Sequence, residues 1–219
     1  MPRILVTREF AEPLQGFLVD QGCEVVHVPL VELKATHTPA PHSSPDAVVV
    51  TSQAVVRFVP ELRSYIQGAR VIAVGMATAE ALLAHGVVPN DVGRSGGLEA
   101  LVYLQLKEGE RAWYVGAEKP SPKLAAALDE MGLERWPVYQ NTRPVGFEGL
   151  LREAKFDGVA FTSGSAVRAF VEVRGVPHCP VFALGSSTAE VAEELGVEVT
   201  AIAEKASLTK LAEAITGQC

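Results

Sequence analysis

Short apolar runs are spaced along the whole chain and predict the strands of a parallel sheet. Strands that are buried on both faces of such a sheet are apolar throughout and lack the alternation of a half-exposed strand. On this basis we expect strands at residues 4–6, 24–28, 47–50, 70–74, 112–115, 159–161, 181–184 and 198–201.

The segments between these runs carry apolar residues at a spacing of three to four and predict helices. Several of them stop at a glycine, which commonly ends a helix. The expected helices are residues 13–21, 77–85, 122–131, 166–173 and 188–195. Alternation of strand, short loop and helix predicts an α/β fold with parallel crossovers.

The chain also repeats itself at about half its length. The pair Thr51-Ser52 returns as Thr162-Ser163 after 111 residues, and the sequence AVGMATAE from residue 73 returns as ALGSSTAE from residue 183. This period is far longer than that of a solenoid, so it predicts two similar domains. We expect the functional site to lie between them.

Two segments rich in proline and polar or small residues predict linkers, at residues 34–45 and 140–146. Both fall inside a repeat. The predicted domains are therefore a continuous one at residues 38–140 and a discontinuous one that joins residues 1–35 with 145–219. The chain then crosses between the domains twice, which favours a hinge and a cleft that opens and closes.

The composition is that of an ordinary globular protein, with 48% hydrophobic and 21% charged residues among 219. No stretch approaches the roughly 20 consecutive apolar residues of a membrane span, so we expect a cytoplasmic protein that binds no membrane. The net charge of −7 disfavours a broad nucleic-acid surface. A small anion can still be held by a few basic side chains and by helix N-termini.

The three cysteines, Cys23, Cys179 and Cys219, have neither CxxC nor Cys/His metal spacing. We interpret them as unpaired structural thiols and expect no zinc site. The nucleophile-elbow, HExxH, P-loop and complete GxGxxG motifs are absent from the sequence. An enzyme with this sequence would act mainly by holding and shaping a reactive substrate, with help from a hydroxyl acid.

The first candidate site element is a Thr-Ser turn that occurs once in each repeat. Thr51-Ser52 and Thr162-Ser163 each follow a predicted strand and precede a helix. This position places hydroxyl and N–H groups at the carboxyl edge of the sheet, where open α/β sheets bind ligands. Capping of the following helix, without any ligand, is the alternative interpretation.

The second candidate element is a glycine turn at the same edge. Gly75 precedes Thr78 by three residues, and Gly185 precedes Thr188 in the same way. Glycine lets the backbone approach a ligand closely, and the threonine could cap a helix whose N–H groups receive an anion. Four such turns, two per repeat, indicate an anion-rich ligand.

Several motifs in order along the chain resemble uroporphyrinogen-III synthases. They are LVTR at 5–8, GCEV at 22–25, PLVE at 29–32, PVYQNT at 137–142, TSGSAVRAF at 162–170 and both Gly-x-x-Thr-Ala turns. The resemblance covers essentially the whole chain. One departure is the sequence VGAE at 115–118, where the family often has Arg-Gly-Glu after the mid-chain strand.

The resemblance implies a fold of two similar small parallel-sheet, flavodoxin- or Rossmann-like α/β domains joined by a two-stranded β-ladder hinge, with a cleft between them. It implies a cytoplasmic lyase that cyclises the tetrapyrrole hydroxymethylbilane to uroporphyrinogen III, with loss of water and inversion of ring D through a spiro intermediate. No metal or organic cofactor is expected. A monomer is the default, and a transient hand-over of substrate from hydroxymethylbilane synthase is left open.

The resemblance also assigns roles to residues of this chain. It maps a proton donor onto Tyr139, for which the alternative is a strand-end aromatic residue that anchors the linker. The basic residues proposed to pair with propionates could equally be exposed charges. The expected substrate-binding residues are Thr51, Ser52, Gly75, Thr78, Thr162, Ser163, Gly185, Ser186, Thr188, Arg8, Arg168 and Lys119.

Two other functions stay open at this level. A hinged two-domain protein that binds a small polyanion without chemistry would carry the same turns. A sugar-phosphate isomerase built from similar units would also use Ser/Thr-rich anion loops, but it would need a carboxylate or histidine base that the sequence does not clearly offer.

Overall fold

The computed structural model describes residues 1–94 and 97–218. The chain forms two compact units: unit 1 is Met1–Glu32 with Thr142–Cys219, and unit 2 is Leu33–Asn141. The domain boundaries inferred from the linkers stay a prediction. Of the three cysteines interpreted as unpaired, Cys179 carries a free thiol, Cys23 is buried, and Cys219 lies outside the described residues.

Unit 1 is built on a five-stranded sheet of order β11-β10-β9-β1-β2 in which all neighbours pair in parallel. Its central strands are apolar and buried, as their sequences require. The strands are β1 (Arg3–Val6), β2 (Glu24–His27), β9 (Gly158–Phe161), β10 (Val181–Ala183) and β11 (Ala201–Ile202).

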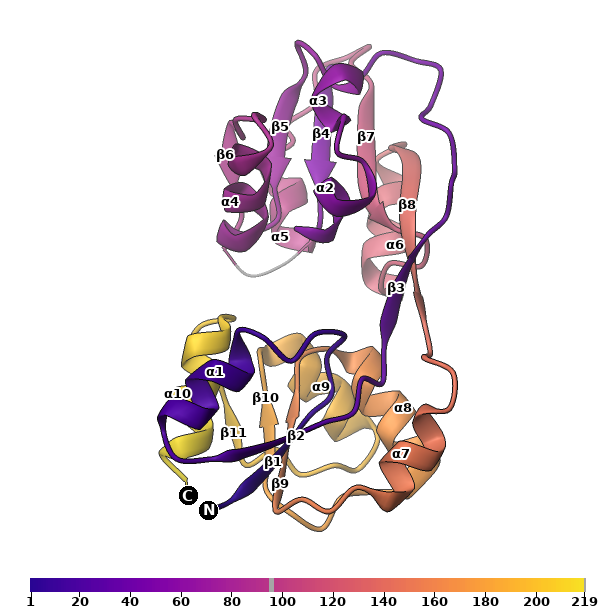
Figure 1. Cartoon of the computed structure of the whole chain (residues 1–219). Coiled ribbons are helices and arrows are strands. Elements are labelled where there is room, and N and C mark those ends of the chain that lie inside the picture. Colours follow the sequence, from indigo (N-terminus) through magenta and orange to yellow (C-terminus); the bar gives the residue numbers. More distant parts are fainter. Residues whose placement is uncertain (95–96, 219) are drawn as a thin grey trace. The chain divides into compact units, whose positions relative to one another are not determined.

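Helices cover both faces of this sheet (Figure 1). On one face, α1 (Leu14–Asp20) and α10 (Leu208–Thr216) pack side by side against the apolar side chains of β1. On the other face, α7 (Phe147–Glu153), α8 (Gly164–Arg174) and α9 (Ser186–Glu194) enclose a core rich in phenylalanine. The helices therefore cover the faces of the sheet, and loops lie at the ends of its strands.

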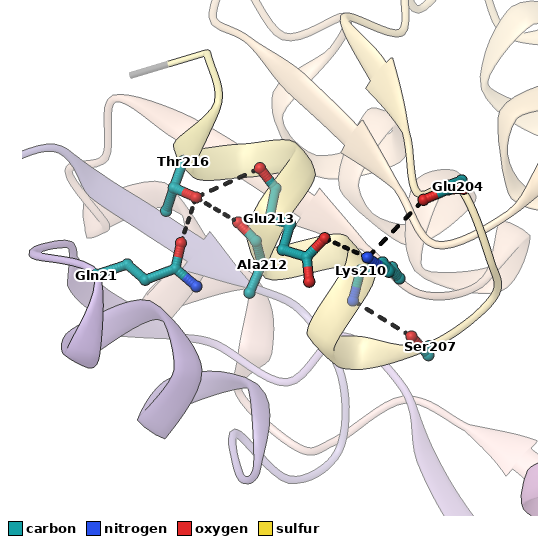
Figure 2. Close-up of polar contacts among 7 residues, drawn as sticks. All are labelled: Gln21, Glu204, Ser207, Lys210, Ala212, Glu213 and Thr216. Atoms are coloured by element: carbon teal, nitrogen blue, oxygen red, sulfur yellow. Dashed lines mark hydrogen bonds and ion pairs between the residues drawn. The ribbon is translucent and has the colours of Figure 1, made fainter.

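Polar contacts fix the last helix of unit 1 (Figure 2). The Ser207 side chain accepts a hydrogen bond from the N–H of Lys210 and so caps the start of α10. At the other end, the hydroxyl of Thr216 donates to Oε1 of Gln21, which follows α1. The two helices of this face are therefore joined by a hydrogen bond as well as by their apolar contact.

Unit 2 contains a six-stranded sheet of order β3-β8-β7-β4-β5-β6. The first strand, β3, pairs with β8, and the chain passes between the units in these two strands, which confirms the predicted two-stranded connection. The strands are β3 (Glu32–Ala35), β4 (Ala47–Val50), β5 (Arg70–Ala73), β6 (Asp91–Val92), β7 (Ala112–Ala117) and β8 (Glu134–Thr142).

The helices of unit 2 also form two layers (Figure 1). One layer is α2 (Ala54–Phe58), α3 (Leu62–Tyr65) and α4 (Met76–Ala84), packed on a core that includes both tryptophans. The other layer is α5 (Gly97–Val102) and α6 (Pro122–Glu130). Tyr114 is in this second core, whereas Tyr139 is in the first, so the two phenols lie on opposite faces of the sheet.

The internal repeat is confirmed by the order of the strands. The order β2-β1-β9-β10-β11 in unit 1 corresponds to β8-β7-β4-β5-β6 in unit 2. Polar details repeat as well: Asp157 accepts from the N–H of Arg3, and Asp46 accepts from the N–H of Arg111, both at 2.8 Å. The predicted α/β fold of parallel sheets is therefore correct for both units.

The predictions were wrong for one strand and missed several elements, most of them short. Residues 198–201 form no strand before Ala201, because the Thr200 side chain accepts a hydrogen bond from Val181 N–H at the start of β10. The expected ranges also left out the short strands β3 and β6, the nine-residue strand β8 and the helices α2, α3, α5, α7 and α10. Apart from α10, these helices have seven residues or fewer, too few to show a clear period. Across the described residues, no helix is both long enough and apolar enough to cross a membrane.

Candidate functional site

Each sheet has one point at which its connections turn in opposite directions. In unit 2, β7 leads through α6 to β8 on one side, while β4 leads to β5 on the other. Ligands of open α/β sheets bind at the carboxyl ends of two such strands. Thr51 and Ser52 directly follow β4, and Gly116 lies at the end of β7, so this crevice contains the predicted Thr-Ser turn.

The Thr51 side chain is packed tightly into this crevice. Its N–H and its hydroxyl both donate to the Val115 carbonyl, at 3.2 and 3.4 Å, across the gap between β4 and β7. A Cβ placed on Gly116 would lie 2.1 Å from Thr51 Oγ1 and 2.7 Å from the Tyr114 hydroxyl oxygen. The two hydroxyl groups therefore occupy the space that a side chain at residue 116 would fill.

Two buried tyrosines meet the Thr-Ser turn. The Tyr114 hydroxyl donates to the Ala117 carbonyl at 3.2 Å and interacts with Thr51. The Tyr139 hydroxyl interacts with Ser52, the next residue of the turn, and its ring stacks on Phe58 with centroids 5.9 Å apart. The turn is thus held from both faces of the sheet.

Both phenols keep their protons. Burial raises the pKa of Tyr139, and the interaction with the Ser52 hydroxyl only partly opposes this rise. Burial likewise raises the pKa of Tyr114, with an opposing contribution from Thr51. Tyr139 is therefore a neutral hydroxyl at physiological pH, able to donate a proton or a hydrogen bond.

An irregularity in the sheet sets the position of Tyr139. The register between β7 and β8 shifts at Gly116/Ala117, so that Ala117 faces Tyr139. As a result Val138 and Tyr139, although adjacent, are both buried in the same core. The N–H of Glu118 then donates to the Tyr139 carbonyl at 2.8 Å.

The glycine turn of unit 2 differs from the prediction in one respect. Gly75 is the N-cap of α4 in an extended conformation, and its carbonyl accepts from the N–H groups of Thr78 and Ala79. No side chain caps this helix, and Thr78 is only 4% exposed, so the predicted capping by Thr78 is wrong. Met76, at the first helical position, is 65% exposed.

The crevice of unit 1 lies between β1 and β9, and polar groups gather there too. The buried Thr7 hydroxyl donates to the Ala160 carbonyl at 2.9 Å. Thr162 and Ser163 follow β9, and Ser163 caps α8 by accepting from the Ala166 N–H at 3.3 Å. Capping is thus one role of Ser163.

Arg8 lies at the same edge of unit 1, directly after Thr7. Its guanidinium donates to the Glu12 carbonyl at 3.0 Å, and its own carbonyl lies 2.9 Å from Nε2 of His27. Partial burial lowers the pKa of Arg8, but the guanidinium stays charged at physiological pH because the ordinary pKa of arginine is very high. Arg8 therefore presents a partly desolvated positive charge at the carboxyl edge that also holds Thr162 and Ser163.

The glycine turn of unit 1 repeats the arrangement around Gly75. Gly185 is the extended N-cap of α9, without a side-chain cap, and Thr188 is buried. The predicted capping by Thr188 is therefore wrong for the same reason. Ser186 and Ser187 stand in the first turn, where backbone N–H groups have no acceptor within the helix.

The structure does not bring Arg168 to this edge. The Arg168 guanidinium forms an ion pair with Glu194 at 3.2 Å, and Glu194 is the last residue of α9, at the opposite end from Gly185. Lys119 is exposed in the loop after β7, at the carboxyl edge of unit 2. Within residues 1–94 and 97–218, no three His, Cys, Asp or Glu side chains are grouped to hold a metal ion.

Comparison with known proteins gives the family. The family model described as uroporphyrinogen-III synthase HemD matches residues 12–213, which is most of the chain. The chain belongs to the uroporphyrinogen-III synthase family. No curated protein matches it in sequence.

Solved uroporphyrinogen III synthases have the same fold. The enzyme from Helicobacter pylori aligns with a TM-score of 0.71 and 18% identity, covering 100% of both chains. A mutant, selenomethionine-labelled enzyme from Thermus thermophilus aligns with a TM-score of 0.70 and 21% identity, covering 100% of this chain and 99% of that chain. At these identities the likeness concerns the fold.

Part of the candidate site could not be predicted from the sequence of this uroporphyrinogen-III synthase family member. Neither Tyr114 nor Gly116 was a candidate, because a tyrosine within an apolar run is indistinguishable from a core residue. The available signal was the VGAE sequence at 115–118, a departure from the family's usual Arg-Gly-Glu. The structure shows that its glycine leaves room for the hydroxyls of Thr51 and Tyr114.

Proposed function

We propose that this protein is a lyase that cyclises hydroxymethylbilane to uroporphyrinogen III, with loss of water and inversion of ring D. The observation that carries the proposal is the match of residues 12–213 to the uroporphyrinogen-III synthase family. Two polar crevices at parallel-sheet edges, one in each unit, support it.

The substrate's acetate and propionate arms are bound by local positive potential, since the protein as a whole carries a charge of −7. In unit 1, the first turn of α9 at Ser186 and the charge of Arg8 supply it. In unit 2, Lys119 and the first turn of α4 at Gly75 have the same role. The side chains of Ser52, Thr162 and Ser163 line these edges. Thr78 and Thr188 contribute by packing, since they are buried.

Tyr139 is the proton donor of the proposed reaction. Its raised pKa keeps the phenol protonated, and transfer of that proton to the terminal hydroxyl lets it leave as water. The resulting azafulvene is attacked by the substituted carbon of ring D, and the spiro intermediate fragments and recloses with ring D reversed. Loss of a proton at the final carbon returns the proton to the phenolate, so the enzyme ends unchanged.

Product analysis tests the proposed function. Hydroxymethylbilane is generated in situ, the protein is added, and the oxidised products are separated as uroporphyrin isomers. Without an enzyme, closure at the unsubstituted position gives isomer I, so we expect the protein to shift the product to isomer III. Isomer I at the proportion found without protein would overturn the proposal and favour a protein that only binds the tetrapyrrole.

A further inference from the structure

Tyr114 carries a hydroxyl group that is not needed to fill the core. The residue is 1% exposed, and phenylalanine would fill the same volume in the core around β7 without burying a polar oxygen. That oxygen instead reaches the end of the strand, where it donates to the Ala117 carbonyl at 3.2 Å. It also lies with Thr51 Oγ1 over Cα of Gly116, so residue 116 must lack a side chain.

We propose that Tyr114 is a positioning residue for Tyr139, acting through the Thr51–Ser52 turn on one side and through Ala117 on the other. The inference deepens the proposed function, since it concerns the geometry of the proton donor. Tyr114 does not touch the substrate in this proposal.

The first connection runs through the turn. Thr51 is fixed by its two hydrogen bonds to Val115 and by the Tyr114 hydroxyl. Ser52 follows Thr51 directly, so the position of Thr51 determines where the Ser52 hydroxyl meets the phenol of Tyr139. Removing the Tyr114 hydroxyl leaves Thr51 with fewer partners and lets Ser52 move.

The second connection runs through the register shift. Ala117, whose carbonyl accepts from Tyr114, is the residue of β7 that faces Tyr139 after the shift. The next N–H, that of Glu118, donates to the Tyr139 carbonyl at 2.8 Å. The Tyr114 hydroxyl therefore holds the segment of β7 to which the backbone of Tyr139 is bonded.

The test uses the four tyrosines as four probes. The full-length protein is labelled with tyrosine carrying ¹³C at Cζ, the carbon that bears the hydroxyl, and each resonance is assigned by a Tyr→Phe variant. We expect Tyr114→Phe to shift the Tyr139 resonance at neutral pH, because its hydrogen-bonding environment changes. Tyr103→Phe is the matched control, since Tyr103 packs on the same core but is not part of the crevice, and it should leave Tyr139 unchanged.

A second pair of variants guards against misfolding of Tyr114→Phe. Thr51→Val removes the hydroxyl but keeps the shape, and it should shift the Tyr139 resonance in the same direction. Thr51→Ser keeps the hydroxyl and should restore the wild-type resonance. If the Tyr139 resonance stays in place in Tyr114→Phe and in Thr51→Val, the inference is wrong; if Tyr114→Phe does not fold, Thr51→Val alone decides.

Kinetics separate this inference from the proposed function. Loss of one hydrogen bond of about 1 kcal/mol corresponds to a fall of roughly fivefold, so Tyr114→Phe should lower kcat for isomer III by that factor and leave KM unchanged. If the wild-type protein makes no isomer III, the proposed function fails, while the resonance shifts still decide whether Tyr114 positions Tyr139. An unchanged kcat in Tyr114→Phe, with a wild-type protein that makes isomer III, would overturn the inference.

Discussion

Gly116 and Thr51 approach each other so closely that a methyl group on Gly116 would lie 2.1 Å from Thr51 Oγ1. The contact crosses the gap between β4 and β7, where the connections of the unit 2 sheet diverge. Gly116 is not in a left-handed conformation, so a glycine is needed at this position for lack of space and not for its backbone freedom. With glycine at residue 116, the hydroxyl groups of Thr51 and Tyr114 fill the space that the methyl group of an alanine would need.

Gly116→Ala should therefore be strongly destabilising. The neighbours of the added carbon include the buried phenol of Tyr114, which cannot retreat easily, so we expect a loss of about 1–3 kcal/mol in the free energy of unfolding. Urea denaturation measures this loss. Gly149→Ala is the control: nothing lies within 4 Å of its added carbon, and it is inside helix α7, so the variant should be as stable as wild type or more so.

Tyr139→Phe should abolish most turnover without unfolding the protein. The ring remains stacked on Phe58, whereas the proton donor is lost, so we expect the rate of isomer III formation to fall by about 10²–10⁴. Tyr65→Phe is the matched control, because Tyr65 is 43% exposed and packs its ring on Trp136 in the same core. Full turnover by Tyr139→Phe would remove this residue from the acid role.

The raised pKa of Tyr139 predicts how stability depends on alkaline pH. A group whose pKa is higher in the folded than in the unfolded state stabilises the fold fully below the unfolded pKa, about 10 for tyrosine. That contribution is lost as pH rises through the folded pKa. Between about pH 9 and 11, the unfolding free energy of wild type should therefore fall more steeply with rising pH than that of Tyr139→Phe, which lacks the titrating phenol. Parallel pH profiles for the two proteins would contradict this.

The sequence predicted the fully apolar strands, and these strands place most of the candidate site. It missed β8, the nine-residue strand that carries Tyr139, because charged and polar residues stand at both of its ends. Runs such as Ala47–Val50 are typical of buried strands, and the strands around them bring Thr51 and Ser52 to the sheet edge. Side-chain roles within the edge were not predictable in the same way. Thr78 looked like a helix cap but is buried within the first turn, since Gly75 is the N-cap residue.

The hidden part of the site depends on contacts between segments far apart in the sequence. Tyr114 meets Thr51 across two strands, and the shift of register that buries Tyr139 next to Val138 involves the pairing of β7 with β8. Periodicity within one segment carries no information on either. The sequence did contain Gly116. The need for a glycine there is recognised only when the hydroxyl groups of Thr51 and Tyr114 are placed next to it.

Variants of Ser163 can separate helix capping from substrate binding. Ser163→Ala removes the acceptor of the Ala166 N–H and should cost about 1 kcal/mol of stability. Ser163→Asp keeps a capping oxygen, so its stability should stay near that of wild type, but its negative charge would repel a carboxylate substrate. We expect Ser163→Asp to raise KM by about tenfold, equivalent to roughly 1.4 kcal/mol of binding. An unchanged KM would mean that Ser163 only caps α8.

Arg8 and Arg168 should differ sharply in their effect on substrate binding. Arg168 already pairs with Glu194, both side chains are more than half exposed, and such pairs contribute about 0–1 kcal/mol. Arg168→Ala should therefore change KM by less than about twofold. Arg8 lies beside Thr7 at the carboxyl edge, and burial of its guanidinium strengthens its attraction for an anion.

Arg8→Ala should accordingly raise KM about tenfold, the effect of losing roughly 1.4 kcal/mol of binding. The increase should shrink as salt is added, because screening weakens the contribution of a charge that remains partly open to solvent. Arg8→Lys is the matched control: it keeps the charge and should recover most of the affinity. Equal effects of Arg8→Ala and Arg168→Ala on KM would contradict the placement of the substrate's carboxylates at the edge of β1.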